Sequence, residues 1–193
     1  MELGVGQPIL LRPGEGEVIS DSAARRTEIL CDHPTLVATW SRRGPWADGA
    51  SPHVHRAHCD LFYVLAGELT FLVGPEQEER VLPAGTIALA PPLVVHGFRN
   101  GSDSEVRYLN FHAPGGGFAD YLRGVTPGFD SEDPPADGGR PTSDAVIVPP
   151  GSGGVLVDRD EIRIEVLDEP GSSSGRPTFL YTLDDGRLLE IRA

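Results

Sequence analysis

Three histidines, a cysteine and an aspartate fall within eight positions in the stretch HVHRAHCD, residues 53–60. Residues two apart in a strand point to the same face, so we expect His53 and His55 to lie side by side. A tight turn after them would bring Asp60 back beside both on the next strand. His96 lies far along the chain, in the apolar stretch LVVHGF. Three imidazoles and a carboxylate from at least two strands suit one divalent transition ion such as Fe, Mn, Ni, Cu or Zn.

The sequence also predicts where five other polar residues lie. His58 falls in the predicted turn, out of phase with the other histidines, so we expect it at a solvated rim. Cys59 is a candidate metal ligand or redox group, but a small buried thiol is the simpler interpretation. His112 and Asn110 reach the same cavity if residues 106, 108, 110 and 112 of their strand face inward; otherwise His112 is a surface residue. His33, before a proline, is expected in a turn.

Strand alternation also predicts what surrounds these polar groups. Phe62 and Val64 share the face of Asp60, and Val94 and Phe98 share that of His96. They would form an apolar pocket for a small molecule, or the ordinary core beneath the site.

Trp46, in the loop GPWADG, is a candidate lid over this pocket. Loop tryptophans are as often plain packing, so both interpretations stay open.

The elements that must position these residues are short strands separated by turns. The predicted strands cover residues 35–41, 60–65, 68–73, 86–92, 93–100 and 105–112. This spacing favours an antiparallel sandwich or barrel, because a parallel fold would need helical crossovers for which there is no room. One short helix is predicted over residues 116–125. The fold class is therefore all-β.

Two motifs in this region resemble those of the cupin superfamily. The first runs His53-x-His55-x4-Asp60-x6-Gly67, and the second runs Gly85-x5-Pro91-x-Leu93-x2-His96-x3-Asn100. The resemblance covers about residues 35–113. It implies a cupin-type double-stranded β-helix, or jelly-roll barrel, whose mouth holds a metal through the first-motif histidines and acid and the second-motif histidine.

The chain departs from the family pattern at three positions. Ala47 and Leu93 stand where the motifs have turn glycines, and Asp60 stands where the family has a glutamate. The aspartate is one methylene shorter, and three outcomes stay open: its carboxylate falls short of the metal, binds it through water or pulls the ion off centre. Three histidines still hold a metal without it. The alternative is a barrel that has lost its metal and binds only a ligand.

The chain divides into four predicted parts. Residues 1–34 form strands and turns that pack on the barrel, 35–125 form the cupin barrel, 126–145 form a Pro-, Gly- and acid-rich linker, and 146–193 form a C-terminal β segment. The segment 148–167 resembles 11–30, so it is interpreted as a partial second repeat, or as a shared strand-turn-strand habit. It lacks histidines, because the last one in the chain is His112.

Charge and hydropathy exclude several classes of partner. The net charge is −13 and the pI about 4.7, so nucleic acids and anionic membranes are not expected partners. No apolar stretch is long enough to span a bilayer, and the N-terminus does not resemble a secretory signal, so we expect a cytoplasmic protein. Sheet edges must be covered, so we expect a homodimer whose interface uses the terminal segments, residues 1–30 and 145–193.

The resemblance is to quercetinase-like single-domain cupins, which implies a dioxygenase-like enzyme acting on a small apolar or aromatic molecule. Non-redox isomerase, cyclase or lyase chemistry uses the same ion as a Lewis acid and stays open. Asp60, where it does not bind metal, and His112 are the candidate catalytic groups. A function of another class is a non-catalytic small-molecule-binding module.

Overall fold

The all-β prediction is confirmed by a computed structural model, which describes residues 9–150, 157–159, 162–167, 178–182 and 188–192. The helical elements are α1 (Phe118–Leu122) and one 3-10 turn (Thr142–Asp144). The strands are β1 (Ile9–Leu11), β2 (Glu17–Asp21), β3 (Arg25–His33), β4 (Leu36–Arg43), β5 (Asp48–His53), β6 (Cys59–Ala66), β7 (Glu68–Val73), β8 (Glu78–Pro83), β9 (Ile87–Ala90), β10 (His96–Arg99), β11 (Val106–Ala113), β12 (Val146–Val148), β13 (Val157–Arg159), β14 (Ile162–Leu167), β15 (Thr178–Thr182) and β16 (Leu188–Arg192).

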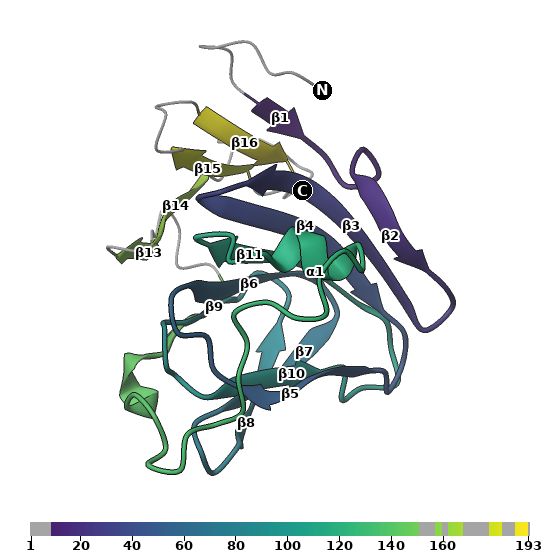
Figure 1. Cartoon of the computed structure of the whole chain (residues 1–193). Coiled ribbons are helices and arrows are strands. Elements are labelled where there is room, and N and C mark those ends of the chain that lie inside the picture. Colours follow the sequence, from purple (N-terminus) through teal and green to yellow (C-terminus); the bar gives the residue numbers. More distant parts are fainter. Residues whose placement is uncertain (1–8, 151–156, 160–161, 168–177, 183–187, 193) are drawn as a thin grey trace.

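Two antiparallel sheets form the barrel. The larger has seven strands in the order β12-β9-β6-β11-β4-β3-β2, and the smaller has four in the order β5-β10-β7-β8. Figure 1 shows the smaller sheet facing the larger one. Each predicted strand has a counterpart in these sheets, whereas β8 lies where no strand was predicted. The cupin-type fold expected from the sequence is therefore confirmed.

The core of the barrel lies between the two sheets and beneath the candidate site. It contains Phe62 and Val64 from β6, Phe71 from β7 and Tyr108 from β11, each at most 2% exposed. Burial of one such side chain stabilises the fold by roughly 1.5–3 kcal/mol. Because residues two apart share a face, the same alternation that buries Phe62 and Val64 points Asp60 inward at the end of β6.

A second apolar cluster occupies the opposite face of the seven-stranded sheet. It includes Leu36, Leu61, Leu109 and Phe111, each at most 1% exposed. Figure 1 shows a five-stranded sheet, in the order β1-β16-β15-β14-β13, on that side of the barrel. The C-terminal segment is thus the layer that adjoins the outer face of the larger sheet.

The predicted repeat has a structural counterpart in strand register. In the first hairpin β2 pairs with β3, and Asp21 lies opposite Arg26. In the second β13 pairs with β14, and Asp158 lies opposite Arg163. These four residues are equivalent in the sequence match between the two segments. Of the other matched positions, Glu165, Val166 and Leu167 lie in β14, and those within residues 151–156 lie outside the described residues.

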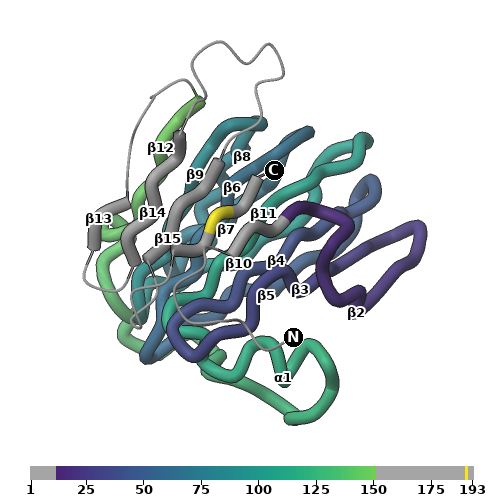
Figure 2. The backbone as a smooth tube through the Cα atoms, turned by 90° about the horizontal axis from the view of Figure 1, so that it is seen from above, coloured from purple at the N-terminus to yellow at the C-terminus, as the bar shows by residue number. Residues whose placement is uncertain are grey.

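The chain after β11 folds back against one end of the barrel. Figure 2 shows α1 projecting at this end. Part of the predicted linker also packs there, because Glu132 forms a β-bridge with Val54 and the ring of Phe129 lies 5.0 Å from that of Phe118. Within the described part of the chain, no helix is long and apolar enough to cross a membrane.

Candidate metal centre

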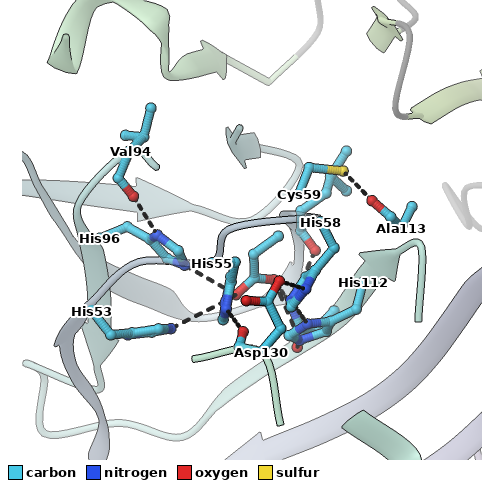
Figure 3. Close-up of polar contacts among 12 residues, drawn as sticks. His53, His55, His58, Cys59, Val94, His96, His112, Ala113 and Asp130 are labelled. Atoms are coloured by element: carbon cyan, nitrogen blue, oxygen red, sulfur yellow. Dashed lines mark hydrogen bonds and ion pairs between the residues drawn. The ribbon is translucent and has the colours of Figure 1, made fainter. Parts of the chain in front are cut away.

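The four residues predicted as metal ligands converge at the mouth of the barrel. Figure 3 shows the side chains of His53, His55 and His96 pointing toward one another. His53 ends β5 and lies opposite His96, the first residue of β10. His55 follows two residues after His53, and Asp60 is the second residue of β6. One donor atom from each residue lies within 4.8 Å of the others. Strands of both sheets therefore bring together residues that lie up to 43 positions apart in the sequence.

The distances between donor atoms fit a first-row ion. The Nε2 atoms of His53 and His55 are 3.2 Å apart, and Asp60 Oδ2 lies 3.3 Å from His96 Nε2 and 3.8 Å from His55 Nε2. Ligands bound at about 2.1 Å and separated by 90–110° lie about 3.0–3.4 Å from each other. The first two separations lie in this range and the third lies above it, so the shorter Asp60 carboxylate reaches the same region as the imidazoles.

In each of the three candidate histidine ligands, a hydrogen bond from the second ring nitrogen, Nδ1, fixes the tautomer. The acceptors are the carbonyl oxygen of Ser51 for His53 Nδ1 (2.7 Å), that of Asp130 for His55 Nδ1 (2.5 Å) and that of Val94 for His96 Nδ1 (2.9 Å). A carbonyl oxygen only accepts, so Nδ1 carries the proton and Nε2 presents a lone pair. The Nε2 atoms of His53 and His55 then face each other without a proton between them. A bound cation would satisfy both.

The protonation states also suit a metal. Burial, with the neighbouring His96 and His55, lowers the pKa of His53 to about 4, so its ring is neutral at neutral pH. Burial alone raises the pKa of Asp60, but His112, His55 and His96 outweigh it and hold that pKa well below its usual range. Asn110 Nδ2 donates to Asp60 Oδ1 and fixes the carboxylate. The centre therefore combines the neutral imidazole of His53 with an ionised, buried acid.

The prediction that His58 lies at a solvated rim is wrong. Its side chain is 1% exposed, and its ring stacks on that of His55 at 3.9 Å between centroids. Burial and His55 lower the pKa of His58 to about 4. The turn after His55 folds inward instead of outward because Asp130 caps it, accepting hydrogen bonds from Arg56 N (2.9 Å) and Ala57 N (2.8 Å).

His58 belongs to a row of polar contacts that ends at the candidate ligand Asp60. Asp130 Oδ2 lies 2.9 Å from His58 Nδ1, and His58 Nε2 lies 2.9 Å from His112 Nδ1. His112 Nε2 lies 3.0 Å from Asn110 Oδ1 and 3.7 Å from Asp60 Oδ1. Both alternatives for His112 are thereby resolved: it is buried and faces the cavity, and burial lowers its pKa to about 3.

A cavity of about 420 Å³ opens beside this centre. Among the predicted pocket residues, Phe98 and Asn110 line it, as do His53, Asp60 and His112. Three others, Phe62, Val64 and Val94, are fully buried in the core beneath it.

The lid of this cavity differs from the predicted one. Trp46 is 66% exposed and is not among the residues that line the cavity. The aromatic cover comes instead from Phe118, Tyr121 and Phe129. The ring of Phe129 lies 4.8 Å from that of Tyr121, and the ring of Phe118 stacks on His112 at 3.8 Å.

The remaining predictions concern residues outside the centre. Cys59 is buried, and its Sγ lies 3.4 Å from the carbonyl oxygen of Ala113, as expected for a structural thiol. His33 ends β3 and its Nδ1 lies 2.8 Å from Thr35 Oγ1, as expected for a turn residue. The sequence analysis did not identify Asp130, Phe129, Arg25 or Arg43 as residues of the site.

These features define a double-stranded β-helix with a His3Asp cluster, fit to hold a divalent metal, at its open end. Residues 44–112 match the family model described as Cupin domain, so this stretch of the chain is a cupin domain. No curated protein matches the chain.

Several solved structures are similar to it. KdgF from Halomonas sp. has 21% identity and a TM-score of 0.48, over 56% of this chain and 94% of that chain. An RmlC-like cupin from Shewanella frigidimarina has 24% identity and a TM-score of 0.45, over 53% and 86%. The polyketide cyclase RemF from Streptomyces resistomycificus has 21% identity and a TM-score of 0.44, over 52% and 75%.

Proposed function

We propose that this chain is a metal-dependent enzyme that acts on a small molecule in the cavity beside the histidine cluster. His53, His55, His96 and Asp60 hold one divalent transition ion, Fe, Mn, Ni, Cu or Zn. The observation that carries the proposal is the convergence of three Nε2 lone pairs and an ionised carboxylate on one point, with every Nδ1 proton held by a backbone carbonyl. Dioxygenase-like chemistry is the first candidate.

The ion would supply dioxygen activation or Lewis-acid polarisation of a bound oxygen. The chain's own residues do the rest. The carbonyl oxygens of Ser51, Asp130 and Val94 orient the imidazoles, and Asn110 holds the Asp60 carboxylate. The aromatic rings over the mouth exclude water, which strengthens every electrostatic interaction inside.

His112 carries the second candidate, a non-redox isomerase, cyclase or lyase. Its ring is neutral at neutral pH and lines the cavity. Polar contacts through His58 connect it to Asp130 near the surface. A neutral imidazole beside the substrate can exchange a proton with it without any change of oxidation state. Asp60 is committed to the ion in this scheme, so His112 is the group that moves the proton.

Elemental analysis of the purified protein tests the metal centre. We expect about one equivalent of a transition metal in the parent. The His53→Ala/His96→Ala double variant should lose it while keeping the circular dichroism spectrum of the parent. His33→Ala is the matched control, because this histidine ends β3 outside the cluster.

The element found then separates the two chemistries. A redox-active ion with substrate-dependent oxygen consumption supports the dioxygenase-like candidate, and zinc without oxygen consumption supports the non-redox one. A parent that holds no metal, even after incubation with each of these ions, refutes the proposal. The chain would then be a non-catalytic ligand-binding module.

A further inference from the structure

One wall of the cavity is polar and cationic, which neither the metal centre nor the aromatic cover explains. Side chains alternate along β4, so Thr39, Ser41 and Arg43 all face the cavity. Thr27 and Arg25 of the adjoining strand β3 line the same wall. A wall of hydroxyl groups and guanidinium groups suits a charged ligand better than a wholly apolar one.

The two arginines lie directly opposite each other on neighbouring strands. Like charges in this position destabilise a sheet. Neither Arg25 nor Arg43 forms an ion pair with any residue that the structure describes. The chain carries 29 acidic residues against 16 basic ones, so carboxylates are not scarce. The fold therefore keeps an uncompensated cation pair at the cavity.

The arginine adjacent to each of these two in the sequence provides an internal comparison. Arg26 and Arg42 also lie opposite each other, on the outer face of the same sheet. Both are neutralised: Arg26 pairs with Asp21 at 2.7 Å and Glu28 at 2.8 Å, and Arg42 pairs with Glu105 at 3.3 Å. Two identical cross-strand pairs thus differ only in which face they occupy. The pair that faces the cavity is the one without carboxylates.

The surroundings of Arg43 hold its guanidinium group in place. Its Nε donates to Tyr108 OH at 3.2 Å, and its Cζ lies 5.7 Å from the ring centroid of Phe98. Its two terminal nitrogens make no hydrogen bond within the described residues, so they remain available for a bidentate acceptor.

Besides Asp60, two acidic residues line the cavity. Glu132 pairs with Arg56 at 2.5 Å, and Asp133 is exposed and forms no ion pair with either arginine of the wall.

We propose that the substrate is a small carboxylate whose acidic group binds Arg43, with Arg25 at the rim, while its apolar or aromatic body lies over Phe98 towards the metal centre. Phe98 follows His96 by two residues, about 7 Å along β10, so one small molecule can touch both the cation and the centre. Planar carboxylates match the guanidinium fork, and the aromatic cover suits a ring. This inference rests on the proposed function, since it assigns the substrate class of the same cavity.

Calorimetric titration with benzoate and benzamide tests the inference, because the two probes share a ring and differ in charge. We expect benzoate to bind the metal-loaded protein at least about tenfold more tightly than benzamide, in line with a charge-assisted contact. Arg43→Gln should abolish this preference, and Arg43→Lys should restore part of it. Arg42→Gln, the matched variant on the outer face, should leave it unchanged.

The same titration of the metal-free His53→Ala/His96→Ala variant separates this inference from the proposed function. A preference for benzoate that persists there and depends on Arg43 supports the anion site, whatever the metal analysis shows. Metal in the parent without any Arg43-dependent preference overturns the carboxylate inference alone. Thermal melting gives a further readout. Relief of the like-charge contact with Arg25 opposes the loss of the Tyr108 hydrogen bond and the Phe98 contact, so Arg43→Gln should melt close to the parent. A lower melting temperature together with an unchanged preference would make Arg43 merely structural.

Discussion

Replacement of Asp130 by alanine tests how the segment after α1 supports the metal centre. The Asp130 carboxylate accepts hydrogen bonds from Arg56 N and Ala57 N, and it lies 2.9 Å from the Nδ1 atom of the buried His58. Its own carbonyl oxygen accepts from His55 Nδ1. The variant keeps this carbonyl but removes the side chain that fixes its position.

The contacts of Asp130 set the size of the expected effect. Water can replace the carboxylate at the exposed Arg56 and Ala57 amides, so each of these bonds contributes about 0.5–1.5 kcal/mol. His58 is 1% exposed, and leaving its N–H without an acceptor costs about 1–3 kcal/mol. The free energy of unfolding should fall by about 2–6 kcal/mol. Metal affinity should fall about 10–100-fold, as for other groups that orient a ligand.

Urea unfolding of the parent and the variant, followed by circular dichroism, measures the stability, and competition with a chelator measures metal affinity. Asp133→Ala is the control, because this exposed carboxylate has no ion pair among the described residues, and it should change stability by no more than about 0.5 kcal/mol. A loss below about 1 kcal/mol for the Asp130 variant, with unchanged metal affinity, would refute the reasoning.

The pH dependence of this loss follows from the pKa of Asp130. Burial raises this pKa, but the amides of Arg56 and Ala57 and the ring of His58 outweigh burial and lower it below 3.8. A group whose pKa is depressed in the folded state stabilises it above the unfolded pKa of about 4. The difference between parent and variant should therefore be full above about pH 5 and vanish as the pH falls through the lowered value.

Three further perturbations have expected outcomes. Leu93→Gly should stabilise the fold by up to about 1 kcal/mol in urea unfolding. Leu93 has φ of 67°, and a non-glycine residue in the left-handed region costs about 1–2 kcal/mol, part of which the conformational entropy of glycine in the unfolded chain offsets. Leu93→Ala should bring no such gain. Gly116→Ala should destabilise more than Gly124→Ala in the same assay. Both glycines have positive φ, but only at Gly116 would the new Cβ lie 2.7 Å from His58 Nδ1. The chain should scatter as a homodimer that uses its terminal segments, and a monomeric mass at micromolar concentration would contradict this.

Much of the candidate metal centre could be predicted from the sequence, because the spacing of the motif residues follows the alternation of side chains along a strand. His53 and His55 lie two apart, so spacing predicts that they share a face, and the register of β10 with β5 then places His96 opposite His53. Leu93, which replaces the second motif's turn glycine, adopts φ of 67°, a region that glycine tolerates best. At Ala47 the motif glycine is replaced without a positive φ.

The errors arose where a contact joins segments far apart in the sequence. The sequence analysis placed His58 at the rim because its position in a predicted turn reflects only the neighbouring residues. The burial of His58 depends on Asp130, 72 residues later. Asp130 itself lies in a stretch rich in proline, glycine and acid, which gave no periodic signal. The β-bridge between Val54 and Glu132 brings this stretch onto the mouth. No pattern within the stretch predicts that bridge.

The cation pair of the cavity shows what strand register adds to a sequence pattern. The chain has Arg-Arg steps at residues 25–26 and 42–43. Since side chains alternate, each step sends one arginine to each face of the sheet. The pairing of β3 with β4 then decides that Arg25 meets Arg43 inside and that the other two meet outside. Acids on β2, on β3 and just before β11 neutralise only the outer pair, so the inner pair is left for a ligand to neutralise. An apolar substrate alone, as expected from the sequence, would leave both inner charges uncompensated in the bound state.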